Sequence, residues 1–187
     1  MPILGIMASQ ISGHLFAPSG AYDSIATATV GSGGSSSISF TSIPSTYTHL
    51  QVRCLMRTNL AATTLDTYIK INTGTSYYYH YLYGNGATAA AGGGSIATLL
   101  TGRATGSTAT ASTFGVSIVD ILDYTNTNKN KTIRVLNGDD NNGSGNTFLF
   151  SGVSLSTTAI TDLTFTAETA SSFVQYSQFA LYGIKGA

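Results

Sequence analysis

The chain has little charge, a single cysteine and no long apolar run. Asp, Glu, Lys and Arg make up 9% of its 187 residues, and the eight cations and eight anions cancel. An average globular protein has about 25% charged residues. A chain balanced in this way lacks the basic excess with which proteins bind the phosphate backbone of nucleic acid. We therefore expect no nucleic-acid partner.

The single cysteine, Cys54, has no second cysteine to pair with, so no disulfide can form within the chain. Packing alone must then stabilise the fold. No apolar run approaches the roughly 18 residues of a transmembrane helix, and the first residues lack the positive region of a secretory signal. We expect a protein that neither spans a membrane nor follows the usual export route.

The scarcity of charge also bears on self-association. A neutral surface of Thr, Ser, Asn and Gly produces little electrostatic repulsion between copies. This composition favours a protein that works in an assembly.

Residues 48–58 carry the clearest structural pattern. Leu50, Val52, Cys54 and Met56 alternate with polar residues, and only Leu55 breaks the period of two. That period is typical of a half-buried β-strand, whereas a helix would scatter these apolar residues around its circumference. The pattern predicts a long inner strand of an antiparallel sheet.

Residues 1–21 contain no charged side chain and many apolar ones. Disordered segments are poor in such residues, so this segment needs a surface on which to lie. We predict an extended N-terminal arm that folds back on its own domain or docks onto another subunit. The candidate contact residues are Ile3, Leu4, Ile6, Met7, Ile11, His14, Leu15 and Phe16.

Residues 22–187 predict a single all-β domain. Residues 22–30 and 36–41 form an expected hairpin around a Gly-rich turn, and residues 114–123 and 131–136 form another. Residues 84–113 predict a long loop with one short element, and residues 137–146 predict a turn. The remaining expected strands are 65–72, 76–83, 147–155, 159–167 and 173–184. Such a pattern predicts an antiparallel β-sandwich, for which we favour a jelly roll.

Several segments resemble a family of tailed-bacteriophage virion structural proteins, and the likeness covers nearly the whole chain. They are residues 4–9 (LGIMAS), 22–27 (YDSIAT), 30–34 (VGSGG), 43–53 (IPSTYTHLQVR), 120–129 (DILDYTNTNK), 141–145 (NNGSG) and 179–186 (FALYGIKG). The resemblance implies a place in a virion without saying which. Trimeric cement proteins of capsids and β-sandwich modules of tails or fibres both look like this.

No catalytic constellation is visible, and we expect neither an enzyme nor a cofactor. His14, His49 and His80 accompany no nucleophile motif, and Asp120 and Asp123 fall on opposite faces of a strand. The segment from Asp139 to Gly143 alternates oxygen-bearing side chains as a calcium loop does. It lacks the bidentate acid of such a loop, so a plain turn is favoured and no metal is expected.

The strand 76–83 places Tyr77, Tyr79, Tyr81 and Tyr83 on one side, and we expect both of its faces to be covered. These tyrosines can serve core packing, a subunit interface or a sugar-binding platform. Outward-pointing arginines on strand 48–58 form either a solvated face or a cross-subunit contact. These two arginines, Arg53 and Arg57, are the second group of candidate subunit-interface residues.

These features lead to one functional hypothesis with one alternative. The protein is expected to be a homotrimeric capsid decoration or cement protein, made in the host bacterial cytoplasm, which binds between major capsid subunits on the outer surface of the head. Its arm and edge loops would supply the contact. The alternative is a tail or head fibre module that recognises a host-surface glycan through the tyrosine strand or residues 84–113.

Overall fold

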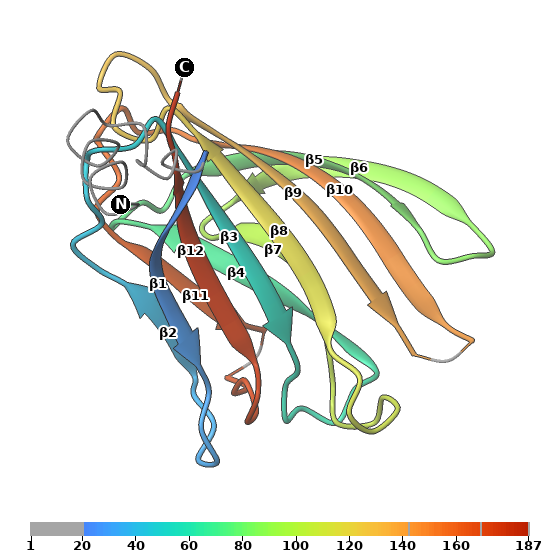
Figure 1. Ribbon diagram of the computed structural model, residues 1–187. Helices are drawn as coiled ribbons and strands as arrows, with labels where there is room; N and C mark the ends of the chain where they lie inside the picture. The colour runs from blue at the N-terminus through green and yellow to red at the C-terminus, as the bar shows by residue number, and fades with distance from the viewer. Residues whose placement is uncertain (1–20, 142, 169, 187) are drawn as a thin grey trace, which may run out of the picture.

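A computed structural model describes residues 21–141, 143–168 and 170–186. These residues form β-strands, turns and loops (Figure 1). The strands are β1 (Tyr22–Thr29), β2 (Ser37–Phe40), β3 (His49–Met56), β4 (Thr64–Ile71), β5 (Tyr77–Gly84), β6 (Ala89–Ile96), β7 (Leu99–Thr105), β8 (Gly115–Leu122), β9 (Lys131–Asp140), β10 (Gly145–Ser154), β11 (Leu163–Ala167) and β12 (Gln178–Ile184). The described part of the chain holds no helix with the length and hydropathy needed to cross a membrane.

The strands form two antiparallel sheets that enclose one apolar core. The wide sheet has the order β1-β12-β3-β8-β9-β10-β5-β6, and the narrow sheet has the order β2-β11-β4-β7. Eight of these strands wind as a jelly roll: β1-β12-β3-β8 oppose β2-β11-β4-β7, so that early strands pair with late ones. The predicted β-sandwich, in its jelly-roll form, is confirmed.

Two additional hairpins widen one sheet only. The hairpin β5–β6 lies in the chain between β4 and β7, and the hairpin β9–β10 lies between β8 and β11. Both join the wide sheet beyond β8 because β10 pairs with β5. Figure 1 shows β5 and β6 at one end of this sheet and β1 at the other. The wide sheet therefore extends well past the narrow one.

Strand β3 lies between β12 and β8, in the interior of the wide sheet. Leu50, Val52, Cys54 and Met56 are at most 1% exposed, whereas Leu55 points to the outer face. Full burial of such a side chain contributes roughly 1.5–3 kcal/mol. Burial also raises the pKa of the Cys54 thiol, so this cysteine stays protonated and unreactive. The predicted inner strand is confirmed.

The expected hairpin between residues 22–30 and 36–41 is wrong. Both strands exist, but β1 pairs with β12 in the wide sheet and β2 pairs with β11 in the narrow one. The turn at residues 31–35 carries the chain from one sheet to the other. Alternation reveals which face of a strand is buried but not which strand is its neighbour.

The expected long loop at residues 84–113 is also wrong in its first part, which contains β6 and β7. The sequence of β6 is AAAGGGSI, which has no apolar alternation and a composition typical of loops. It forms a strand because β5 supplies eight paired residues for its backbone. Residues 106–114 remain irregular.

The expected turn at residues 137–146 is much shorter than predicted, because residues 137–140 continue β9 and Gly145 begins β10. Asn137 and Asp139 point inward and are at most 5% exposed. Asn137 hydrogen-bonds the backbone of β7, and Asp139 Oδ2 accepts hydrogen bonds from Asn141 and Asn146. The other hairpin, residues 114–123 with 131–136, is confirmed as β8–β9.

Candidate functional site

The tyrosines of β5 build an aromatic cluster on the inner face of the wide sheet. Tyr79, Tyr81 and Tyr83 are partly buried there beside Phe148 and Phe150 of β10. Ring centroids lie 5.2 Å apart for Tyr83 and Phe148, 5.3 Å for Phe148 and Phe150, and 5.7 Å for Tyr81 and Phe150. These ring contacts bury the inner face of β5 and β10, the strands by which the wide sheet extends past the narrow one.

Tyr77 is not available as an interface residue, contrary to expectation. It is fully buried, and its hydroxyl accepts a hydrogen bond of 2.9 Å from the Ile71 N–H. Burial raises the pKa of this phenol. The first tyrosine of the strand therefore belongs to the core, which leaves Tyr79, Tyr81 and Tyr83 as candidates.

The second face of β5 is open to solvent, which corrects the expectation that both faces are covered. Tyr78 is 50% exposed and Leu82 is 59% exposed, and His80 is exposed between them. Among the described residues nothing packs over this face of the strand. It is part of the outer face of the wide sheet.

An outer apolar patch crosses six strands of that face. The strand registers place Ile118, Leu136, Leu149, Leu82 and Ala91 directly opposite one another on β8, β9, β10, β5 and β6. The next row continues the patch on β3 and β8, where Leu55 lies opposite Val116. We define the outer apolar patch as Leu55, Leu82, Ala91, Val116, Ile118, Leu136 and Leu149. Its leucines and valine are each about half exposed.

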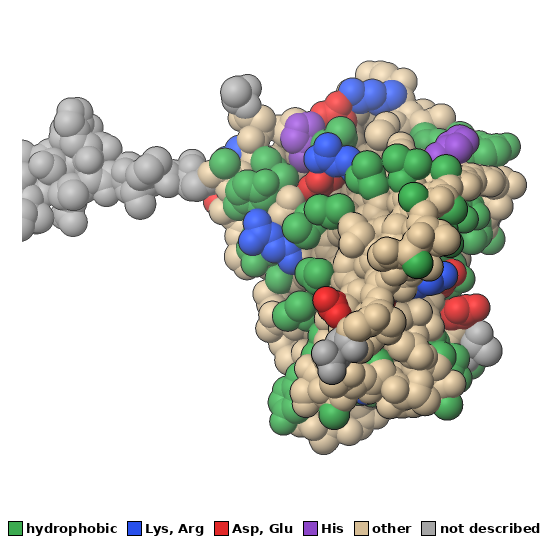
Figure 2. Space-filling view, turned by 90° about the vertical axis from the view of Figure 1, so that its right-hand side faces the viewer, with side chains coloured by type: hydrophobic (Ala, Val, Ile, Leu, Met, Phe, Trp, Pro, Cys, Tyr) green, Lys and Arg blue, Asp and Glu red, His purple; other side chains and the backbone are tan. Residues whose placement is uncertain are grey.

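A polar row borders the patch on one side. Asp120 of β8 accepts hydrogen bonds from Arg134 at 3.0 Å and from Gln51 at 2.8 Å. The register continues this row through Ser151 to His80. Figure 2 views the molecule from the β5–β6 side and shows a surface made mainly of uncharged groups. The patch therefore has a defined polar limit on an otherwise neutral surface.

The two candidate arginines have different surroundings. Arg53 is exposed on the outer face, where its guanidinium lies 5.2 Å from the Tyr182 ring centroid and 5.7 Å from that of Tyr22. Arg57 instead donates to the backbone oxygens of Thr110 and Thr113 at 2.7 and 2.9 Å. Arg57 therefore fastens the loop before β8, and only Arg53 remains available for a neighbour.

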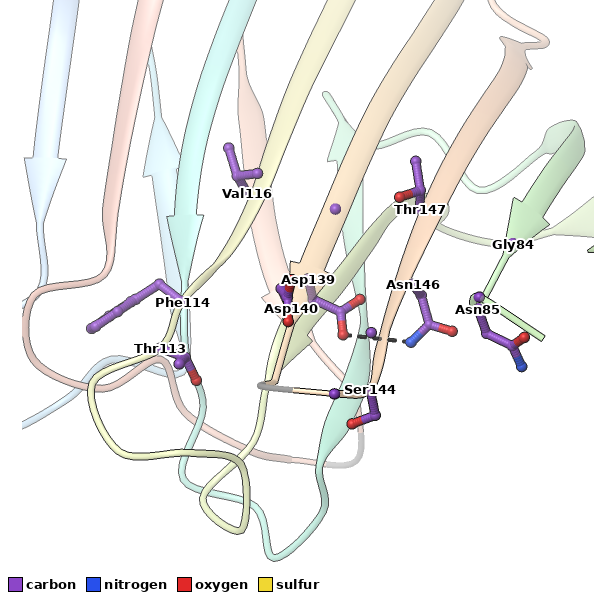
Figure 3. Close-up of a pocket in the computed structure, with 14 residues that line it drawn as sticks. Gly84, Asn85, Thr113, Phe114, Val116, Asp139, Asp140, Ser144, Asn146 and Thr147 are labelled. Atoms are coloured by element: carbon purple, nitrogen blue, oxygen red, sulfur yellow. Dashed lines mark hydrogen bonds between the residues drawn. The ribbon is translucent and has the colours of Figure 1, made fainter. Parts of the chain in front are cut away.

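A polar pocket of about 650 Å³ lies where the β5–β6 turn, the β9–β10 turn and the segment before β8 converge (Figure 3). Asn85, Asn146, Ser144 and Thr113 supply polar groups, and the partly exposed Phe114 ring points away from the two asparagines (Figure 3). Amides and hydroxyls are groups that can hydrogen-bond the hydroxyls of a sugar. The sequence prediction did not identify this pocket, because its parts lie in three separate segments.

Asp139 lies at the inner end of this pocket. Its Oδ2 accepts weak hydrogen bonds from Asn141 at 3.3 Å and from Asn146 at 3.4 Å. Asp139 Oδ1 and Asn141 Oδ1 are buried and have no hydrogen-bond partner among the described residues. Burial raises the pKa of the Asp139 carboxyl, although the Asn146 hydrogen bond and Arg103 oppose this effect. The described residues contain no group of three or more His, Cys, Asp or Glu side chains that could hold a metal ion.

The remaining sequence candidates have other positions. His49 Nδ1 accepts a hydrogen bond of 2.9 Å from the Asp123 N–H, which is a structural role. The arm candidates lie outside the described residues: Ile3, Leu4, Ile6, Met7, Ile11, His14, Leu15 and Phe16. No protein-family model, curated protein or solved structure matches this chain.

Proposed function

We propose that this protein is a structural component of a tailed-bacteriophage virion, and specifically a decoration protein that binds between major capsid subunits on the outside of the head. The observation that carries this proposal is the outer apolar patch on a neutral, eight-stranded sheet. The sequence resemblance to virion structural proteins supports it. The expected homotrimer is not required by this role, which needs only that each copy bridge two capsid subunits.

The patch has the physical character of a docking surface. A free monomer rarely exposes contiguous apolar area on this scale without a partner for it. Covering a half-exposed leucine contributes roughly 1 kcal/mol, so the patch alone supports a contact of modest affinity. A specific interface needs about 800 Å² from each partner. We propose that the N-terminal arm supplies the remaining apolar area.

Many copies on one particle make a modest contact sufficient. When each copy bridges two capsid subunits, the second contact forms at high effective concentration. Low net charge also allows neighbouring copies to lie close together without repulsion. The proposed role is therefore mechanical: many joints resist the internal pressure of the packaged genome.

Particles that lack the protein test the proposal. We expect them to adsorb to host cells normally but to release their DNA at a lower temperature than complete particles. Adding the purified protein back should restore heat resistance. Particles that keep full heat resistance without the protein would contradict the proposed role.

A second candidate function is glycan recognition, and the polar pocket is the observation that favours it. Asn85, Asn146 and Ser144 could hydrogen-bond the hydroxyls of a sugar. In that case particles without the protein should remain heat-resistant and fail to adsorb. Asn146→Ala should reproduce the adsorption defect, whereas Ser39→Ala on the narrow sheet should not.

A further inference from the structure

The four sheet edges differ in how they are protected from pairing with other strands. Strand β1 has a register shift between Ser24 and Ala26, and its Asp23 forms an ion pair with Lys185 at 2.7 Å. Strand β2 has only four residues, and β7 is almost wholly buried. A bulge, a charge, short length and coverage are the usual protections of an edge. Strand β6 has none of these.

Strand β6 (Ala89–Ile96) is eight residues long, carries no charge and contains no proline. It is the last strand of the wide sheet, and no described strand pairs with its outer side. Six of its eight residues are exposed. A long, uncharged and open edge of this kind is a template for another strand.

The backbone groups that face outward can be assigned. At the β5–β6 turn the Asn85 N–H donates to the Thr88 oxygen at 3.2 Å, which makes these two residues a hydrogen-bonded pair. Such pairs recur every second residue in an antiparallel ladder. Gly92 and Gly94 therefore bond to β5, whereas the N–H and C=O of Ala91, Gly93 and Ser95 point away from the sheet.

The tyrosines of β5 reach over this edge. A Cβ built on Gly92 would lie 2.6 Å from the Tyr81 hydroxyl oxygen, and one on Gly94 would lie 3.8 Å from that of Tyr79. Neither hydroxyl is hydrogen-bonded to another residue of the described ranges. The rings thus bring two unpaired polar groups to the boundary of the sheet, above its unpaired backbone.

We infer that β6 pairs antiparallel with β6 of a second copy, around a two-fold axis near Gly92 and Gly93, so that the two wide sheets become continuous. A two-fold contact requires a surface that complements itself. This edge does so because it has no charge to repel its copy and offers outward donors and acceptors in the same spacing. A charged partner strand would find no complementary charge on this edge.

The tyrosine hydroxyls explain why a second copy fits better than an unrelated strand. With the axis at Gly93, Gly92 lies opposite Gly94 of the second copy, about 4.8 Å away. The Tyr81 hydroxyl then faces the Tyr79 hydroxyl of the second copy across the joint. With the axis at Gly92, the two Tyr81 hydroxyls face each other. In the first register both tyrosine hydroxyls meet a hydroxyl of the second copy, and in the second register only the Tyr81 hydroxyl does.

The solution mass of the full chain tests this inference. Light scattering after size-exclusion chromatography should give about twice the 19.3 kDa chain mass. Ala91→Pro removes one outward N–H without removing a bond to β5, and Ala91→Lys adds a charge to the edge. Each variant should halve the mass, whereas Gln175→Lys in the exposed loop before β12 should leave it unchanged.

Two further measurements keep the result decisive. Amide exchange of the wild type should protect the N–H groups of Ala91, Gly93 and Ser95, and Ala91→Pro should lose that protection at Gly93 and Ser95 with an unchanged melting profile. Leu136→Lys should leave the dimer intact, because Leu136 lies on the patch and not on the edge. A monomeric wild type, or an oligomer that resists both Ala91 variants, would overturn the inference. None of these measurements requires a virion, so their outcome is independent of the proposed function.

Discussion

Asn137 ties the two sheets together although its segment was expected to be a turn. Its Nδ2 donates to the backbone oxygens of Val116 at 2.8 Å and Arg103 at 3.0 Å, and its Oδ1 accepts from the Arg103 N–H at 3.0 Å. Gly102 leaves room for it: a Cβ there would lie 2.2 Å from the Asn137 Cγ, and Gly102 has φ +105°. One side chain therefore satisfies backbone groups of both layers.

We predict that Asn137→Ala destabilises the fold by about 1–3 kcal/mol, because it leaves partly buried backbone groups of Arg103 and Val116 without their Asn137 partner. Urea unfolding measures the change. Asn128→Ala, in the exposed β8–β9 turn, should change stability by less than about 0.5 kcal/mol. Equal effects of the two substitutions would show that Asn137 does not link the sheets.

Asp139 should make stability depend on pH. Burial raises its folded-state pKa above the unfolded value of 3.8, so the folded state holds the proton more tightly. This contribution is favourable below the unfolded pKa and is lost as the pH rises through the folded pKa. We predict that Asp139→Asn gains stability relative to the wild type between pH 3.5 and 7, as measured by thermal melts. A constant difference across this range would contradict the assignment.

At the scale of elements, the sequence predicted strands well where one face is apolar and the other polar. Strand β3 and strand β4 alternate in this way, and their buried residues were identified correctly. Strand β6 was missed because small residues show no alternation, and its tyrosine neighbours fill the space that its own side chains leave. Of the interface candidates, Tyr77 was misassigned. It lies on the same face of β5 as the partly buried Tyr79, Tyr81 and Tyr83, but its side chain is fully buried.

Strand partners were not predictable from local pattern. Consecutive strands are usually neighbours, which suggested the incorrect hairpin of residues 22–41. The actual partner of β1 is β12, and the paired residues are 149 to 162 positions apart in the chain. The outer apolar patch was missed for the same reason: its members come from six strands, and only the strand register brings them together.

We predict that Leu136→Lys weakens binding to capsid shells by at least about tenfold, which is roughly 1.4 kcal/mol. The reason is that Leu136 lies within the five-residue row of the outer apolar patch, between Ile118 and Leu149. Folding stability should change by less than about 0.5 kcal/mol because the side chain is half exposed. Shell occupancy measured by cosedimentation provides the test.

The matched control for this substitution is Ser39→Lys, which places the same charge on the exposed face of the narrow sheet. It should bind shells as the wild type does. If Ser39→Lys weakens binding and Leu136→Lys does not, the narrow sheet is the docking face and the patch has been assigned wrongly.

At the scale of the whole molecule, the arm and the sandwich have separable roles in the proposed function. We predict that deletion of residues 2–16 leaves a folded domain, because the core is built from residues of the strands, but lowers the occupancy of capsid shells. Circular dichroism measures folding and quantitative gel analysis of sedimented shells measures occupancy. Full occupancy by the truncated chain would remove the arm from the proposed contact.

The two hairpins that widen one sheet have a consequence for how such a protein can change. Each hairpin adds two antiparallel strands, so the chain returns to the end of the sandwich from which it left the eight-strand roll. Gain or loss of one hairpin would change the width of the wide sheet by about 10 Å and leave the strand order of the roll unchanged. The width of the molecule can therefore be adjusted in fixed steps to the distance that it must bridge.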